Sequence, residues 1–255
     1  MEVRIKAYPK VNIGLYIGQK RADGFHALSS IFQKVFSFHD LVSVRFENSS
    51  ETGIRVRGLE QFATQEKTTC YMAAEAFLKE TALTGNVLIE VEKHIPVQSG
   101  LGGGSSDGAA VIEALKSITE ASLSERQLLD ISLAAGSDVP FFTSGFEAAF
   151  VSGRGEIVHP VTARKDLVFE FVFPGDSKVS TPLAYAELDR LGIREELPSE
   201  ERLVAMYNLP VRDWEFENDF EKINTRPETG LESGEKLYLS GSGSSWFKVR
   251  QLTCL

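Results

Sequence analysis

A glycine-rich segment at residues 96–106, Pro-Val-Gln-Ser-Gly-Leu-Gly-Gly-Gly-Ser-Ser, is the feature that most constrains the fold of this 255-residue chain. It follows an apolar, β-branched run at 86–92 and leads into a helical pattern at 105–118. A glycine turn that opens a helix leaves backbone N–H groups without partners, and such groups bind anions. Glycine also permits positive φ and a close approach of the anion to the backbone. We therefore predict a phosphate-binding loop here.

The segment does not match the common nucleotide-binding patterns. No Gly-Lys-Ser/Thr closes it, as a P-loop requires, and the dinucleotide fingerprint does not occur in its usual setting. A flexible linker capped by Ser105 is the alternative, but linkers rarely lead so directly into an amphipathic helix. A different nucleotide-binding fold is therefore expected.

The order of apolar patterns predicts an α+β fold. Strand-like runs lie at 2–8, 11–17, 28–38, 41–47, 86–92, 167–173, 235–240 and 245–250, and helical runs at 69–80, 105–118, 124–134 and 181–190. Ser124 and Gln127 have the spacing of a capping box. Strands and helices do not alternate strictly, so a single parallel sheet fits poorly. Turn residues cluster at 153–160, and we expect a domain boundary there, between 1–155 and 156–255.

Composition excludes several classes of function. The net charge of −9 comes without a basic tract, which argues against nucleic acid as a partner. No apolar run approaches the roughly 20 residues of a membrane helix, and the N-terminus lacks a signal-peptide pattern. Only Cys70 and Cys254 are present, at no metal-site spacing, and both are expected to be inert thiols of a reducing compartment. We therefore expect a cytoplasmic protein.

Four other segments are candidates for chemistry, although each has an ordinary structural explanation when taken alone. Lys10 lies between two predicted strands and could be a solvated turn lysine. Asp138 lies between a helix end and an apolar segment and could be a capping or turn residue. Gly241-Ser-Gly243 could be a simple hairpin turn, and a lone His26 is more often structural than a ligand.

Together these segments resemble the GHMP kinase superfamily, whose three short motifs occur here in the same order. Pro9-Lys-Val-Asn12 resembles the first motif, 96–110 the second and 239–243 the third. The triple glycine before two serines is similar to the members that act on a cytidine-bearing metabolite, since members acting on mevalonate or homoserine have a shorter Gly-Leu-Gly-Ser-Ser. Residues 21–26 and 136–142 share this narrower resemblance, which covers most of 5–185.

The resemblance implies a two-domain enzyme that uses ATP and Mg²⁺ to phosphorylate the 2-hydroxyl of a cytidine diphosphate-linked methylerythritol, an isoprenoid precursor. It implies a ribosomal-S5-like N-terminal domain and a ferredoxin-like C-terminal α/β-sandwich. Lys10 and Asp138 would be catalytic: Asp138 accepts the hydroxyl proton, while Lys10 keeps Asp138 ionised and offsets charge on the attacking oxygen.

The same resemblance implies the binding residues. ATP would contact Lys93, Pro96, Gly100, Leu101, Gly102, Gly103, Gly104, Ser105 and Ser106, with Lys93 beside the purine. The substrate would contact Asn12, Phe25, His26, Thr181 and Tyr185, with His26 on the cytosine edge and Phe25 and Tyr185 on the two ring faces. The protein ligands of the metal are not identified by the motifs.

The sequence departs from the family pattern at four places. Phe25 replaces the usual Tyr, Thr68-Thr-Cys70 replaces the usual Asn-Leu before a helix, and Ser244 replaces a Pro. The stretch between Asn218 and Ser240 is also short for the usual helix. A shortened second domain is therefore expected, and an incomplete cover would favour self-association, although nothing in the sequence indicates an oligomer.

Two other functions stay open at this point. One is a GHMP kinase with a different small-molecule substrate, which would keep the glycine loop, Lys10 and Asp138 but have no use for aromatic residues around His26. The other is a non-catalytic binding protein of the same fold, which the presence of both Lys10 and Asp138 disfavours.

Overall fold

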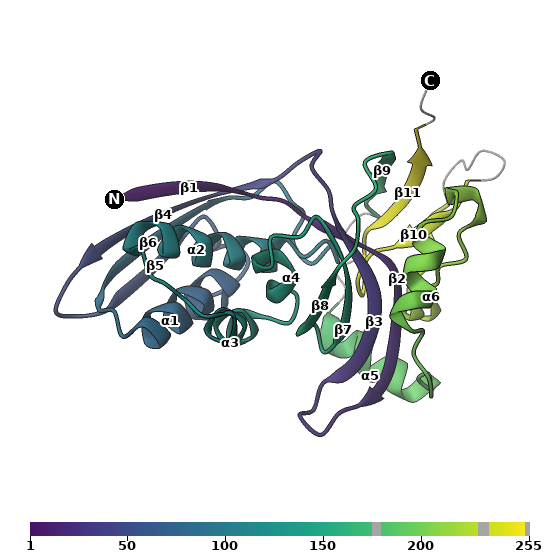
Figure 1. Cartoon of the computed structure of the whole chain (residues 1–255), viewed down its shortest axis with the longest axis horizontal. Coiled ribbons are helices and arrows are strands. Elements are labelled where there is room, and N and C mark those ends of the chain that lie inside the picture. The colour runs from purple at the N-terminus through teal and green to yellow at the C-terminus, as the bar shows by residue number, and fades with distance from the viewer. Residues whose placement is uncertain (175–179, 229–234, 253–255) are drawn as a thin grey trace. The chain divides into compact units, whose positions relative to one another are not determined.

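The computed structural model describes residues 1–174, 180–228 and 235–252, and the chain divides into two compact units (Figure 1). The first unit contains Met1–Pro9, Phe36–Val97 and Gly102–Gly145. The second contains Lys10–Val35, Gln98–Leu101 and Phe146–Leu255. Each unit is therefore assembled from separate stretches of the chain. The expected domain boundary at residue 155 stays a prediction, because the two units are defined by which residues pack together and each combines separate parts of the sequence.

The first unit is built on a four-stranded sheet with the strand order β1-β4-β6-β5. The strands are β1 (Glu2–Ala7), β4 (Asp40–Asn48), β5 (Gly53–Arg57) and β6 (Gly85–Glu92). Neighbours run antiparallel except β5, which is parallel to β6. In β6 every second residue is buried, which gives the sheet one apolar face.

Helices cover that apolar face (Figure 1). They are α1 (Thr69–Thr81), α2 (Gly103–Thr119), α3 (Glu125–Ala135) and α4 (Val139–Thr143), with a short 3₁₀ helix η1 (Gln65–Lys67) before α1. Helix α2 packs on β1 and β4, and α1 packs on α2 and β5. Phe77, Val111 and Leu115 are fully buried at these contacts. The expected capping box of Ser124 and Gln127 starts α3.

The second unit contains two antiparallel sheets. The first has the order β2-β3-β7-β8, from β2 (Lys10–Lys20), β3 (His26–Lys34), β7 (Ala148–Gly153) and β8 (Ile157–Pro160). The other has the order β10-β11-β9, from β9 (Leu167–Val172), β10 (Leu237–Leu239) and β11 (Trp246–Gln251). Its helices are α5 (Thr181–Leu191), α6 (Glu200–Tyr207), and the 3₁₀ helices η2 (Val211–Asp213) and η3 (Asp219–Lys222).

The predicted α+β class is confirmed, and each strand and helix expected from the sequence is present within a few residues of its expected bounds. Sequence patterns did not indicate β5, β7, β8, α4 or α6. In the part of the chain that the structure describes, no helix is long and apolar enough to cross a membrane.

The buried thiol of Cys70 is unreactive by position. Burial raises its pKa well above the ordinary value, so it stays protonated at neutral pH. Cys254 lies outside the described residues.

Candidate active site

The predicted phosphate-binding loop contributes residues 102–106 to the first unit, at the start of α2. These residues are called the cradle below. Gly102 has φ 68°, a left-handed conformation that favours glycine, and α2 begins at Gly103. A β-carbon at Gly103 would lie 2.9 Å from the Ile95 Cγ2, so a larger residue would collide with the apolar floor. Gly104 is exposed and Ser105 is half-buried. The first amide groups of the helix, which have no partner inside the helix, are therefore reached from a side that no β-carbon obstructs.

The two serines that follow the glycines have different environments. Ser106 is buried, and its Oγ donates a hydrogen bond of 2.7 Å to the carbonyl of Tyr8. This bond ties α2 to the chain just after β1. Ser105 is the more accessible of the two hydroxyls, so it is the better placed to reach a bound phosphate.

The turn that carries Asp138 lies beside this cradle within the first unit. A β-carbon at Gly136 would be 3.8 Å from the Ser105 Oγ and 3.5 Å from the Val139 Cγ2. Asp138 is half-buried and immediately precedes α4, whose start is favoured by Pro140 in its first turn. The structure thus brings the segment of Asp138 next to the glycine-serine motif at the start of α2.

Lys93 lies beneath the first turn of α2 between two buried carboxylates. Its Nζ donates to Asp40 Oδ2 and, at 2.9 Å, to Asp107 Oδ2. Burial alone would lower the pKa of Lys93, but Asp107 and Asp40 outweigh it and the pKa is raised. Burial raises the pKa of Asp107 to about 7, against the opposing influence of Lys93. Lys93 is therefore held as an ammonium ion by contacts within the protein.

Lys10 and Asn12 form a buried polar pair in the second unit. Asn12 Oδ1 accepts hydrogen bonds from Lys10 Nζ and from the backbone N–H of Gly241, the latter at 2.9 Å. Lys10 Nζ also donates to the Gly100 carbonyl at 3.1 Å and lies 4.7 Å from the ring centre of Phe32. Asn12 therefore orients the Lys10 ammonium group.

The third glycine motif packs against the beginning of the glycine-rich segment. Ser240 Oγ donates to the Gly100 carbonyl at 3.0 Å, and the Ser245 amide donates to the Ser99 carbonyl at 3.0 Å. Asn218 Nδ2 donates at 2.9 Å to the carbonyls of Leu239 and Gly241. The turn at 241–243 is thus packed on the glycine-rich segment and is not an isolated hairpin.

An imidazole and an aromatic ring stack in the second unit at the predicted base site. The rings of His26 and Tyr185 have centroids 5.1 Å apart and an interplanar angle of 21°. His26 Nδ1 donates to the Gly18 carbonyl at 3.0 Å, because a carbonyl can only accept. His26 Nε2 is 3.4 Å from Asp189 Oδ1. In the neutral ring, Nε2 is then a hydrogen-bond acceptor.

Two further predicted contacts have partners that the sequence did not indicate. Phe25 is 46% exposed, and the guanidinium of Arg154 lies 4.6 Å from its ring centre. Thr181, at the first turn of α5, has its Oγ1 3.1 Å from the Ser242 Oγ of the third motif. The second unit thus links the start of α5 to the third motif.

The predicted site residues are divided between the two units. Those in the first unit are Lys93, Pro96, Gly102, Gly103, Gly104, Ser105, Ser106 and Asp138; those in the second are Lys10, Asn12, Phe25, His26, Gly100, Leu101, Thr181 and Tyr185. Pro96 is exposed and the backbone N–H of Lys10 donates to the Leu101 carbonyl at 2.9 Å. The pairing of Lys10 with Asp138 stays a prediction.

Sequence reasoning did not single out Asp40, Ser240, Asp189 or Arg154. Ser240 falls inside the third motif, so the motif itself was an available signal. Asp40 and Asp189 lie in ordinary strand and helix patterns and carry no local signal.

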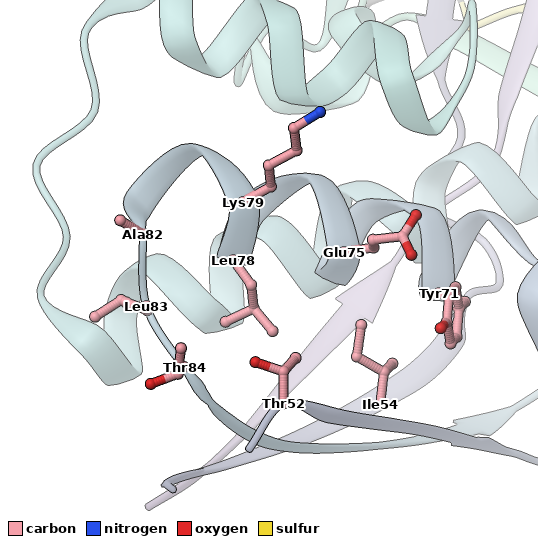
Figure 2. Close-up of a pocket in the computed structure, with 9 residues that line it drawn as sticks. All are labelled: Thr52, Ile54, Tyr71, Glu75, Leu78, Lys79, Ala82, Leu83 and Thr84. Atoms are coloured by element: carbon pink, nitrogen blue, oxygen red, sulfur yellow. The ribbon is translucent and has the colours of Figure 1, made fainter. Parts of the chain in front are cut away.

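A separate pocket lies between α1 and β5 of the first unit (Figure 2). It has a volume of about 490 Å³. Figure 2 shows Ile54 and Leu78 pointing toward one another across it, while Lys79 points away. None of the predicted site residues lines it.

Comparisons with known proteins agree on one family. The model of the GHMP kinase N-terminal domain matches residues 68–146. The chain is 35% identical over 189 residues to 4-diphosphocytidyl-2-C-methyl-D-erythritol kinase of Salinispora tropica, covering 74% of this chain and 59% of that protein. It is 34% identical over 208 residues to the protein of the same name from Clostridium acetobutylicum, covering 81% of this chain and 71% of that protein.

A solved structure is similar over nearly the whole chain. It is a crystal structure of 4-(cytidine 5'-diphospho)-2C-methyl-D-erythritol kinase, 29% identical, with a TM-score of 0.70, covering 98% of this chain and 91% of that chain. The alignment with the Salinispora tropica protein nevertheless spans only 59% of that relative's length.

Proposed function

We propose that this chain, which belongs to the 4-diphosphocytidyl-2-C-methyl-D-erythritol kinase family of the GHMP kinases, transfers the γ-phosphate of ATP to the 2-hydroxyl of 4-diphosphocytidyl-2-C-methyl-D-erythritol. The observation that carries the proposal is the glycine cradle at the start of α2. Its amide groups suit a polyphosphate, and they can be approached at Gly104, which is exposed and carries no β-carbon. ATP therefore fits the residues present.

Phosphoryl transfer depends mainly on positioning and on charge stabilisation, because the protein forms no covalent bond to the phosphoryl group. Asp138, two residues after the Gly136 that lies next to Ser105, would accept the proton of the acceptor hydroxyl. Lys10, oriented by Asn12, would stabilise the negative charge that develops on the attacking oxygen. This division of roles requires the two side chains to meet at the bound substrate.

Mg²⁺ in such a site is held chiefly by phosphate oxygens and water, and it neutralises phosphate charge when bound. Among the described residues no group of three His, Cys, Asp or Glu side chains is arranged to hold a metal ion. We therefore assign no protein side chain to the metal.

The cytidine part of the substrate would bind at His26 and Tyr185. With Nδ1 donating to Gly18, Nε2 of the neutral ring is an acceptor, and Nε2 together with the neighbouring Asp189 Oδ1 would accept from the exocyclic amino group of cytosine. Tyr185 and Phe25 would supply aromatic faces for the base. Uracil has an oxygen where cytosine has this amino group, so it would lose the hydrogen bond.

The test is a coupled assay of purified protein with ATP, Mg²⁺ and the cytidine substrate, with mevalonate and homoserine as alternative acceptors. Phosphorylation of the cytidine compound alone supports the proposal. Turnover of another acceptor would indicate a GHMP kinase of different specificity, and nucleotide binding without turnover on any acceptor would indicate a non-catalytic protein. The inferred cytoplasmic location and the small-molecule partner belong to the same proposal.

A further inference from the structure

The cluster of Lys93, Asp40 and Asp107 contains two carboxyl groups and only one ammonium group directly under the phosphate cradle. Asp40 is fully buried, and the side chain of Asp107 is only 2% exposed. The position of a β-carbon on Gly103 would be 3.2 Å from Lys93 Nζ, so the ammonium group touches the first residue of α2. Asp107 lies four residues later, about one helical turn away.

The two carboxyl groups are not equally satisfied. Asp40 Oδ1 accepts hydrogen bonds from the backbone amides of His94 and Ile95, and Asp40 Oδ2 accepts from Lys93. Asp107 accepts only through Oδ2, and its buried Oδ1 has no partner in the described part of the chain. Hydrogen bonds from amides favour the ionised form of a carboxyl group, and Asp107 accepts none from an amide, so Asp107 is the group that takes up a proton more readily.

We propose that Asp107 is a positioning residue whose charge sets the affinity of the first turn of α2 for nucleotide phosphates, which bind more tightly when Asp107 is neutral. Neutral Asp107 leaves Lys93 and Asp40 as a balanced pair beneath the cradle. Ionised Asp107 adds one uncompensated negative charge about one turn from the phosphates. The inference rests on the proposed function only in placing nucleotide phosphates at this helix end.

The other elements packed on α2 contribute little charge to Asp107. Cys70 of α1 is fully buried nearby and stays a neutral thiol. The charged residues of β1, α1 and α3 are exposed, and α4 carries none. Lys93 and Asp40 are therefore the charges that act on Asp107 directly. The pKa of about 7 places its titration within the physiological range.

The affinity for nucleotide phosphates should fall as pH rises. As pH rises through about 7, Asp107 loses its proton and repels the phosphates. A like charge at this separation, in a partly buried site, lowers affinity by about tenfold. Nucleotide binding at pH above 7 should therefore take up a proton, because bound phosphates favour neutral Asp107.

The experiment measures the dissociation constant of ADP with Mg²⁺ by calorimetry between pH 6 and 8.5, for the full chain, for Asp107→Asn and for Glu113→Gln. Asp107→Asn removes the charge and keeps the shape, and Glu113 is an exposed residue of the same helix. We expect the wild type and Glu113→Gln to lose about tenfold more affinity than Asp107→Asn as pH rises. Titration of the nucleotide itself is common to all three proteins and cancels in this comparison.

A second measurement needs no variant. Calorimetry of the wild type at pH 7.5 in buffers of different ionisation enthalpy should show net proton uptake on ADP binding. Identical pH profiles for the wild type and Asp107→Asn, or no proton uptake, would overturn the inference. Absence of ADP binding at every pH would overturn the cradle itself. A pH effect as expected, without phosphorylation of the cytidine substrate, would uphold this inference while rejecting the proposed function.

Discussion

A β-carbon at Gly100 would lie 2.0 Å from the carbonyl oxygen of Ser240, so these two residues pack backbone to backbone. They are 140 positions apart in sequence. Gly100 also has φ 78°, which disfavours any other residue. The glycine-rich segment and the third motif therefore depend on each other for their conformation.

Replacing Gly100 with alanine tests this contact. Gly100→Ala combines positive-φ strain with a backbone collision, and we expect it to lower the free energy of unfolding by about 3 kcal/mol. Gly145→Ala is the matched control, because Gly145 has φ 77° and a β-carbon added there would meet no atom within 4 Å. It should cost about 1 kcal/mol, from strain alone. Equal losses in urea denaturation would show that the contact is unimportant.

Asp138→Asn should reduce kcat by at least about a hundredfold, because the amide cannot accept the hydroxyl proton. The dissociation constant of ATP should change less than about threefold, since the proposed partner of Asp138 is the acceptor and not the nucleotide. Asp130→Asn, at an exposed position of α3, is the control and should leave both constants unchanged. A matching loss of ATP affinity in Asp138→Asn would assign Asp138 to the nucleotide instead.

Tyr185→Ala should raise the KM for the cytidine substrate by about tenfold or more, because it removes the ring stacked on His26. The KM for ATP should stay within about twofold. Tyr185→Phe keeps the ring and should behave nearly as the wild type. Steady-state kinetics with each substrate varied in turn would make the measurement, and a larger effect on ATP would place Tyr185 in the other pocket.

Asp219 should make the second unit sensitive to acid. Its side chain is 3% exposed, accepts the Ile17 amide at 2.8 Å and pairs with Arg194 at 2.9 Å. Burial would raise its pKa, but Arg194, Ile17 and Lys222 outweigh burial and lower it below the ordinary 3.8. A lowered folded-state pKa means that the stabilisation is complete above the unfolded-state pKa and is lost as pH falls through the folded-state value.

We therefore expect Asp219→Asn to cost about 3 kcal/mol at pH 7, because it leaves Arg194 without its buried partner. The difference in unfolding free energy between variant and wild type should shrink below about pH 4, where Asp219 of the unfolded chain begins to take up a proton. Asp213→Asn is the control, since Asp213 is 52% exposed and lies 3.7 Å from Arg212. Urea denaturation across pH 3 to 7 makes the test, and a constant difference over that range would contradict it.

The sequence predicted the elements whose signals are local. The glycine segment, the long apolar pattern of α2 and the capping box of α3 are each encoded within a few neighbouring residues. Short elements were missed for a physical reason. β5 and β8 contain five and four residues, too few to establish a periodic pattern. α6 was hidden by its charged first turn, although Ser199 followed by Glu200 was a readable cap.

Among the residues of the candidate site, too, only those with a local sequence signal could be predicted. Gly100 and Gly103 could be predicted as binding residues because both belong to the glycine-rich motif at 96–110. Asp40 could not, because its function depends on Lys93, 53 positions away, and on the amides of His94 and Ile95. Likewise, nothing near Asp189 in the sequence indicates that it faces His26. Tertiary contacts create such groups, and single-sequence patterns do not report them.

The most direct test of the proposed function is ATP-dependent phosphorylation of 4-diphosphocytidyl-2-C-methyl-D-erythritol by the purified chain, followed by ³¹P NMR of the product. We predict one new phosphomonoester, on the 2-hydroxyl, formed together with one equivalent of ADP. ATP binding with no phosphomonoester formed from this substrate, under conditions where the protein is folded, would contradict it.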